Sequence, residues 1–110
     1  MSRFGKAWVR LSENIQRGQP VEIRAMIIHP QESGYRLDNT GRAIPRNIVE
    51  SFTCTYGGRE VFRARLHPAM STNPYFVFSV LAQDSGDLRF EWTDDHGDVA
   101  THTARLEVPG

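Results

Sequence analysis

The chain has 110 residues, enough for one domain with a core of its own. Its 13 basic and 13 acidic residues cancel, which argues against a nucleic-acid ligand and against a polybasic membrane anchor. The single cysteine, Cys54, excludes an internal disulfide, and no apolar stretch approaches the roughly 18 residues that a membrane-spanning helix needs.

Residues 1–18 carry charges throughout and lack the apolar run of roughly 7–15 residues that marks a secretory signal. We therefore expect that the chain does not direct its own export. Residues 1–6 are predicted to form a flexible extension, and residues 7–11 an edge strand.

Hydrophobic and polar residues alternate over most of the chain, which is typical of half-buried strands. The Gly57-Gly58 pair favours a hairpin turn between two of these strands, and Gly97 favours a turn before the last strand. Residues 75–81 are apolar on both faces, as in a central strand that is covered on both sides. No helical repeat occurs. The predicted strands are 7–11, 21–28, 48–56, 59–66, 75–81, 87–93 and 99–108.

Seven short strands separated by turns predict a single all-β domain over residues 1–110, an immunoglobulin-like two-sheet sandwich with Greek-key connections. Residues 29–47 form the one long irregular stretch. Segments of this kind on a rigid sandwich are usually binding elements or crossovers between the sheets.

Cys54 shares one strand face with Phe52 and Tyr56, so we expect a buried, inert thiol rather than a nucleophile or sulfur carrier. No pair among His29, His67, His96 and His102 has a spacing that implies zinc, and no serine lies in a Gly-x-Ser-x-Gly motif. Residues 94–98 lack the ligand spacing of a calcium loop and are predicted to be a solvated turn. We expect no metal, no other cofactor and no catalysis.

Surface recognition is the remaining interpretation. Residues 29–36 and 71–76 combine prolines, which lower the cost of ordering, with tyrosine and arginine, which favour protein interfaces. Twelve of the 13 basic residues are arginine and only Lys6 is lysine, as is also typical of interfaces. Genomic base composition explains this bias equally well, and the two segments read equally well as ordinary strand connections.

These two segments give the chain a resemblance to the SoxZ family. The first resembles the pattern H-P-(x)-E-(S/T)-G-x-R-x-D-x-x-G-(x)-x-I-P, and the second resembles S-x-N-P-(aromatic or aliphatic)-x-x-F. Residues 91–97 resemble x-W-x-D-x-x-G, and the likeness extends over about residues 20–107. Gln31 departs from the family, which more often has methionine there. The matching residues are His29, Pro30, Glu32, Ser33, Gly34, Arg36, Asp38, Gly41, Ile44, Pro45, Ser71, Asn73, Pro74, Tyr75 and Phe78.

The resemblance implies a scaffold subunit that pairs with SoxY, a carrier that holds sulfur intermediates on a cysteine in its glycine-rich C-terminal arm. It also implies transient docking of the Sox enzymes of periplasmic thiosulfate oxidation, and export together with the partner. Residues 106–110 do not resemble such an arm, so we expect this chain to be the scaffold subunit and not the carrier. The residues expected to form a partner-binding or structural motif are His29, Pro30, Glu32, Gly34, Arg36, Pro45, Asn73, Pro74 and Tyr75.

We expect one sheet to pack on the partner, with Met26, Ile28 and Val77 as candidates for that face and Phe78 opposite Val77. Two alternatives remain open from the sequence. One is a SoxZ-like module in a pathway built around a quinoprotein dehydrogenase. The other is a thiol- or metal-dependent enzyme that uses Cys54 or the histidines.

Overall fold

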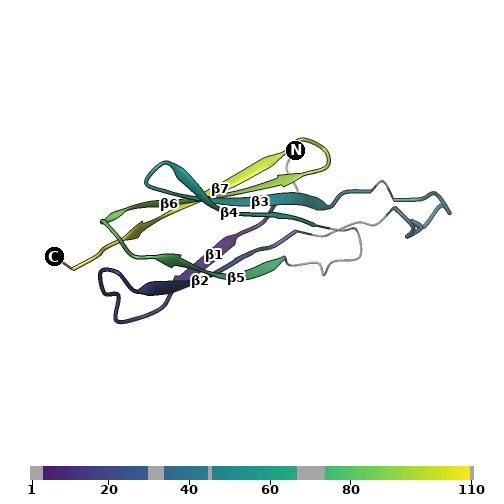
Figure 1. Cartoon of the computed structure of the whole chain (residues 1–110). Coiled ribbons are helices and arrows are strands. Elements are labelled where there is room, and N and C mark those ends of the chain that lie inside the picture. Colours follow the sequence, from purple (N-terminus) through teal and green to yellow (C-terminus); the bar gives the residue numbers. More distant parts are fainter. Residues whose placement is uncertain (1–3, 30–33, 45, 67–73, 110) are drawn as a thin grey trace.

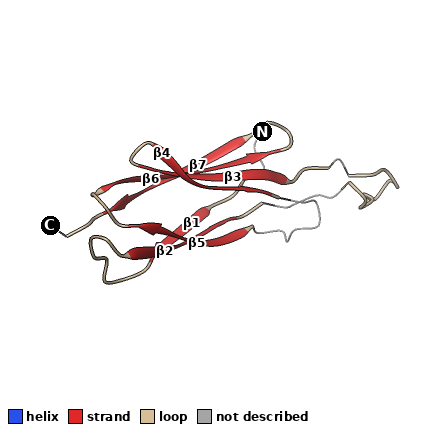
Figure 2. Ribbon diagram, viewed as in Figure 1, coloured by secondary structure: helices blue, strands red, loops and turns tan. Residues whose placement is uncertain are grey.

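The computed structural model describes residues 4–29, 34–44, 46–66 and 74–109. Seven strands, and no helix, occur in these ranges (Figures 1 and 2). None of the described residues belongs to a helix that is long and apolar enough to cross a membrane. The strands are β1 (Ala7–Leu11), β2 (Pro20–Ile27), β3 (Val49–Tyr56), β4 (Arg59–Arg65), β5 (Tyr75–Leu81), β6 (Gly86–Asp94) and β7 (Val99–Leu106).

The strands form two antiparallel sheets that lie face to face as a sandwich (Figure 2). One sheet has the order β1-β2-β5 and the other β4-β3-β6-β7, so the β2–β3, β4–β5 and β5–β6 connections cross between the sheets. This arrangement confirms the predicted all-β immunoglobulin-like sandwich, including the β3–β4 hairpin and the edge position of β1.

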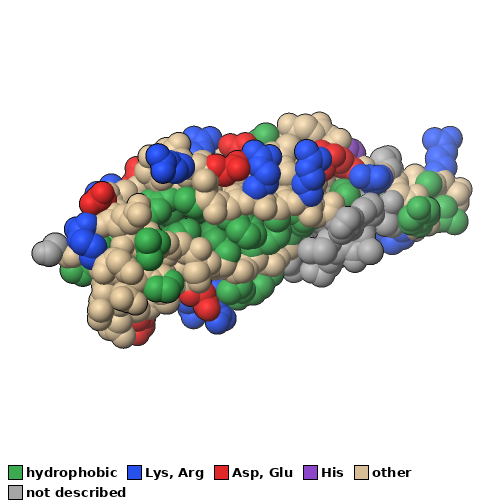
Figure 3. Space-filling view, viewed as in Figure 1, with side chains coloured by type: hydrophobic (Ala, Val, Ile, Leu, Met, Phe, Trp, Pro, Cys, Tyr) green, Lys and Arg blue, Asp and Glu red, His purple; other side chains and the backbone are tan. Residues whose placement is uncertain are grey.

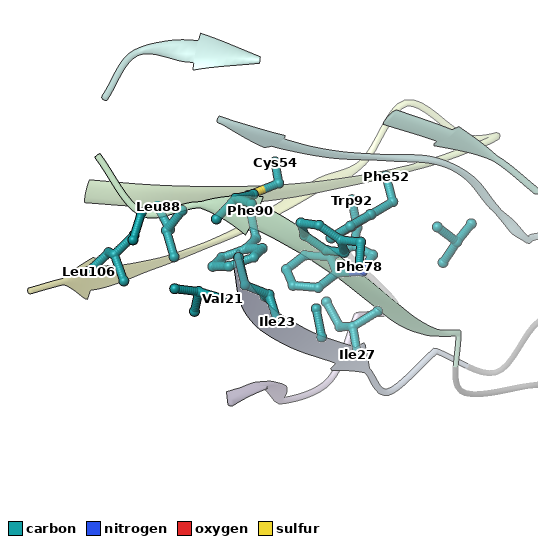
Figure 4. Close-up of a cluster of buried hydrophobic side chains, with 14 of the residues drawn as sticks. Val21, Ile23, Ile27, Phe52, Cys54, Phe78, Leu88, Phe90, Trp92 and Leu106 are labelled. Carbon is teal, nitrogen blue, oxygen red and sulfur yellow. The ribbon is translucent and has the colours of Figure 1, made fainter. Parts of the chain in front are cut away.

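The core is built from the inward face of every strand, as the alternation predicts (Figure 4). The ring of Phe52 on β3 stacks on that of Phe76 on β5 at 4.4 Å between centroids, and it lies 5.1 Å from the Trp92 ring on β6. Phe62 on the edge strand β4 stacks on Phe78 on β5 at 4.3 Å. Aromatic side chains therefore close the sandwich where β4 and β5, the edges of the two sheets, approach each other.

The prediction that residues 75–81 form a central strand covered on both sides is wrong. β5 is an edge strand, and only one of its faces is buried. Tyr75, Val77 and Leu81 on its other face are each about half exposed, at 44%, 50% and 51%. A strand that is covered on both sides has apolar residues on both faces, and so does an edge strand with an exposed apolar face. The sequence pattern alone therefore does not distinguish these two positions.

Residues 4–6 run alongside the end of β2. The Gly5 N–H donates to the Ile28 carbonyl at 2.7 Å, and the Ile28 N–H donates to the Lys6 carbonyl at 3.1 Å. The flexibility predicted for residues 1–6 stays a prediction.

Candidate functional site

The outer face of the four-stranded sheet is polar. Register pairs place Arg63, Thr53, Glu91 and Thr101 in one row across β4, β3, β6 and β7. Charged groups on this sheet pair with each other: Arg63 with Glu60 at 2.7 Å, and arginines of β6 and β7 with nearby carboxylates at 3.0–3.5 Å. A surface of paired charges and threonines is readily solvated.

The outer face of the three-stranded sheet carries large apolar side chains, although Arg10, Glu22, Arg24 and Ser79 also point outward from it. The register places Trp8, Met26 and Tyr75 side by side across β1, β2 and β5, because each occupies the outward phase of its strand. Val77 and Leu81 continue the surface along β5. We call these five residues, together with Ile28 at the end of β2, the apolar face.

Figure 3 shows further hydrophobic side chains in a band between the two layers, bordered above and below by charged groups. Strands β4 and β5 run across this side of the molecule (Figure 1). Their partly exposed hydrophobic residues include Val61, Phe62 and Phe76. Because β5 belongs to both surfaces, this band adjoins the apolar face.

A hollow of about 430 Å³ opens in the apolar face. It is lined by Trp8, Met26, Ile28, Tyr75 and Lys6. Four of these five residues contribute large apolar or aromatic side chains. The hollow can therefore accommodate an apolar group, and the ammonium group of Lys6 lies at its border.

The charges around the apolar face are mainly positive. Arg24 on β2 pairs with Glu22 at 2.8 Å and reaches the Tyr75 hydroxyl at 3.5 Å. The Arg10 guanidinium lies 5.1 Å from the centroid of the Trp8 ring, a cation–π geometry. Neither Arg10 nor Lys6 forms an ion pair with any described residue.

A second feature projects from one end of the sandwich (Figure 1): residues 34–44, which we call the loop hairpin. Its arms are joined by the Asp38 N–H donating to the Arg42 carbonyl at 2.8 Å and the Ile44 N–H donating to the Arg36 carbonyl at 2.7 Å. At the turn, Asp38 Oδ1 accepts hydrogen bonds from both the N–H and the hydroxyl of Thr40 and from the Arg42 N–H. These bonds, led by that from the Thr40 hydroxyl, lower the pKa of Asp38. The loop hairpin is thus an ordered element.

The loop hairpin exposes two large side chains to solvent. Tyr35 is 88% exposed and Leu37 is 61% exposed, the highest values among the large hydrophobic residues described.

Below the loop hairpin lies a polar group that we call the base cluster: the buried His29, Asn47 and Asp94, and the partly buried Asp95. His29 Nε2 lies 3.6 Å from Asp94 Oδ2, with both side chains fully buried. The Asn47 amide nitrogen donates to Asp94 Oδ2 and to Asp95 Oδ1, each at 3.2 Å, and Asp95 Oδ2 accepts from Arg46 at 2.9 Å. The cluster joins the end of β2, the base of the loop hairpin and the β6–β7 turn.

Hydrogen bonds keep the two carboxylates of the base cluster ionised. Burial by itself would raise the pKa of Asp94, but bonds from Asn47, from the N–H groups of Asp98 and His96, and from His29 together lower it. Burial also opposes ionisation of Asp95, and the Ile48 N–H, Asn47 and Arg46 together lower its pKa. The prediction of a solvated turn over residues 94–98 is therefore wrong for Asp94, which is 1% exposed.

The described residues of the predicted partner-binding or structural motif lie in different parts of the fold. His29 and Pro74 are buried, and Gly34 adopts a left-handed φ of 94° at the start of the loop hairpin. Arg36 lies in the loop hairpin, and Tyr75 belongs to the apolar face. Pro30, Glu32, Pro45 and Asn73 lie outside the described residues. Whether these residues contact a partner stays a prediction.

Cys54 is buried, as predicted, with a relative exposure of 0%. Burial raises the pKa of its thiol from an ordinary value of 9.0 to about 12. Within the described ranges, no three His, Cys, Asp or Glu side chains gather as metal ligands would, and His67 lies outside those ranges.

A second hollow, of about 320 Å³, lies at the opposite end of the sandwich from the loop hairpin, between the β3–β4 turn and the β5–β6 connection. The Tyr56 hydroxyl at its wall accepts the Gln83 N–H at 3.2 Å and donates to the Asp84 carbonyl. These bonds hold the connection against β3, so the tyrosine has a structural role here.

Sequence reasoning missed Trp8, Lys6 and the base cluster partners. A signal for Trp8 was present, because Ala7, Val9 and Leu11 take the inward phase of β1 and leave the indole outside. No local signal marks Asn47, because its carboxylate partners lie 47 and 48 residues away.

Comparisons with known proteins agree on the architecture. The model of the family described as sulphur oxidation protein SoxZ matches residues 9–105. No curated protein sequence matches the chain. Superoxide reductase (neelaredoxin) from Ignicoccus hospitalis is similar in structure, with a TM-score of 0.66 and 12% identity over 96% of this chain and 82% of that one. A variant of the same protein gives a TM-score of 0.72 and 11% identity over 98% and 83%. At this identity the likeness concerns the fold alone.

Proposed function

Because the chain belongs to the SoxZ family of sulphur oxidation proteins, we propose that it is the non-catalytic subunit of a sulfur-carrier complex in thiosulfate oxidation. Its partner is a SoxY-like protein that holds sulfur intermediates on a cysteine in its C-terminal arm. This chain supplies a rigid body that positions the carrier and a surface on which the enzymes of the pathway dock transiently.

The observation that carries the proposal is the difference between the two outer faces. The four-stranded sheet presents threonines, paired charges and a separate exposed Val99. The three-stranded sheet carries one charge pair, Arg24 with Glu22, but groups the six large side chains of the apolar face: Trp8, Met26, Ile28, Tyr75, Val77 and Leu81. Large exposed apolar surfaces on small proteins mark interaction sites, and tryptophan, tyrosine and methionine are enriched in them. A permanent pair of this kind buries roughly 2,000 Å² or more.

The state of Cys54 supports a passive role. A sulfur carrier needs a thiol that is accessible and partly ionised. The thiol of Cys54 is buried in the core and its pKa is raised to about 12. The sulfur atom in transit therefore resides on the partner.

We place the complex in the periplasm, exported as a folded pair on the partner's signal. Fractionation of cells that make the chain with and without the carrier tests this. We expect the chain in the periplasm only when the carrier and its signal are present. Export of this chain alone would contradict the proposal.

Co-expression with a SoxY-like carrier is the direct test of the pairing. We expect the two chains to co-purify, and native mass spectrometry to give a 1:1 complex. A chain that remains a monomer in the presence of the carrier, with no change in elution or mass, would contradict the pairing. In reconstituted thiosulfate oxidation, Cys54→Ala should retain full activity, whereas removal of the carrier's cysteine should abolish it.

A further inference from the structure

The hollow in the apolar face differs from the rest of that face in its lining and in the charges at its border. Its walls come from three separate segments: Lys6 and Trp8, Met26 and Ile28, and Tyr75. The register fixes Trp8, Met26 and Tyr75 in one row, so the walls are held by the hydrogen bonds of the sheet rather than by side-chain packing alone.

The backbone at the mouth of the hollow is also fixed. Gly5 and Lys6 exchange hydrogen bonds with Ile28 at 2.7 and 3.1 Å. A Cβ atom added at Gly5 would lie 3.0 Å from the Ile28 Cβ, so glycine permits this close approach. A preformed hollow of this kind binds a side chain with little ordering cost.

The charged residues at the border of the hollow indicate which partner groups would lie next to a side chain bound in the hollow. The outward residues of the sheet and the adjoining Lys6 include three cations (Lys6, Arg10 and Arg24) and one carboxylate (Glu22). Glu22 is paired with Arg24, which leaves Lys6 and Arg10 without a carboxylate partner among the described residues. An interface surrounding this hollow therefore attracts carboxylates.

From the hollow and its border together, we propose that the apolar face accepts a single projecting apolar side chain of the carrier protein, flanked by carboxylates that pair with Lys6 and Arg10. This inference rests on the proposed pairing and adds the chemistry of the partner's surface. An aromatic or branched aliphatic side chain would bury its hydrocarbon against Trp8, Ile28 and Tyr75. The acidic neighbours would set its orientation.

The first test addresses the hollow. Ile28→Asp places a carboxylate in its wall, and Val99→Asp is the matched control, because the two residues are 49% and 50% exposed and Val99 lies on the other sheet. Both variants should retain the wild-type circular dichroism spectrum. We expect Ile28→Asp to weaken the dissociation constant for the carrier at least 100-fold and Val99→Asp to change it less than threefold. Equal effects of the two variants would overturn the assignment of the hollow.

The second test addresses the charges. Lys6→Glu and Arg10→Glu should each weaken carrier binding about tenfold and flatten its dependence on salt, and a carboxylate-to-lysine change in the carrier should restore the affinity. Arg65→Glu on β4 makes the same change of charge on the polar sheet and should leave both quantities unchanged. If Lys6→Glu and Arg10→Glu bound the carrier with wild-type affinity and salt dependence, the proposed carboxylates of the carrier would be overturned, whereas the pairing of the two proteins would stand.

The third test asks whether a second copy of this chain occupies the hollow. Sedimentation of the chain without the carrier should give a monomer. Self-association that Ile28→Asp abolishes and Val99→Asp does not would assign the hollow to a second copy of this chain and overturn the proposal. Absence of any complex between the wild-type chain and the carrier would instead contradict the proposed function.

Discussion

Cys54 illustrates how the position of one residue in a strand determines its chemistry. Its side chain lies on the inward face of β3 between Phe52 and Tyr56, opposite Phe62 and Phe90 on the neighbouring strands. Taking a thiolate into this environment costs its hydration without supplying a cation, so burial raises the pKa of the thiol to about 12. The neutral thiol packs there as a small hydrophobic group.

The folded protein should therefore protect Cys54 from thiol reagents. At pH 8 we expect no reaction with a disulfide reagent until denaturant unfolds the chain, after which one thiol should react. Because the pKa is higher in the folded state, the stabilisation from the neutral thiol is complete below pH 9 and is lost as the pH rises toward 12. Cys54→Ala should lack this component of the alkaline loss, which pH-dependent denaturation measures. Rapid labelling of the native protein at pH 8 would contradict the prediction.

Asp94 shows the opposite case, a carboxylate that stays ionised although buried. Its Oδ1 accepts the N–H groups of His96 and Asp98, each at 2.9 Å, and its Oδ2 accepts Asn47. Although burial alone would raise the pKa, these bonds lower it below the ordinary value of 3.8. The ionised form stabilises the fold above that value, and the stabilisation is lost as the pH falls below it.

We expect Asp94→Asn to lower the free energy of unfolding at pH 7 by about 1–3 kcal/mol, the cost typical of a buried group that loses charged hydrogen bonds. The variant should also lose less stability than the wild type between pH 4 and pH 2, which urea denaturation at several pH values measures. Asp84→Asn is the control, because that side chain is 91% exposed, and it should behave as the wild type. An unchanged acid profile in Asp94→Asn would show that the base cluster does not depend on the charge.

At the scale of elements, β5 has one buried face and one exposed, largely apolar face. Phe78 and Val80 point into the core, whereas Tyr75, Val77 and Leu81 point outward. The register pairs the outward Val77 with the charged Arg24, and it pairs the inward Phe78 with the apolar Ile23.

Substitutions at Phe78 and Val77 should therefore have different consequences. Phe78→Ala should lower the free energy of unfolding by about 3–5 kcal/mol, because it leaves a cavity against Phe62 and Phe52. Val77→Ala should change it by less than about 0.5 kcal/mol and instead weaken binding of the carrier. Chemical denaturation and a binding titration on the same samples check both parts. A large loss of stability in Val77→Ala would contradict the assignment of this face to an interface.

The loop hairpin should behave as a local element. Asp38→Ala removes three hydrogen bonds at its turn and should increase amide exchange at Ile44 and Asp38, whose N–H groups bond across the hairpin. The thermal midpoint should change by less than about 2 °C, because the hairpin projects from the body. A cooperative loss of stability would instead make the hairpin part of the folding core.

At the scale of the whole molecule, the chain is elongated, with extents of 61 × 20 × 19 Å. The apolar face lies on one sheet, and the loop hairpin projects from one end (Figure 1). The apolar face and the loop hairpin are therefore separate surfaces of the described chain.

Binding of the carrier to the folded chain alone should stabilise it by mass action. At a carrier concentration about 1,000-fold above the dissociation constant, we expect a gain of about 4 kcal/mol in the free energy of unfolding. Thermal denaturation followed at increasing carrier concentration measures this. The gain should disappear in Ile28→Asp and persist in Val99→Asp, and a midpoint independent of carrier concentration would contradict the pairing.

The sequence by itself determined the fold class, the positions of seven strands and the burial of Cys54, because side chains alternate with a period of two along any strand. It predicted the edge position of β1 but placed β5 in the middle of a sheet, where the structure has it at an edge. Tertiary structure decided that β5 has a free face, that Trp8, Met26 and Tyr75 stand in one row, and that His29 and Asn47 meet Asp94. Each of these depends on contacts between residues far apart in the chain, which a local pattern does not encode.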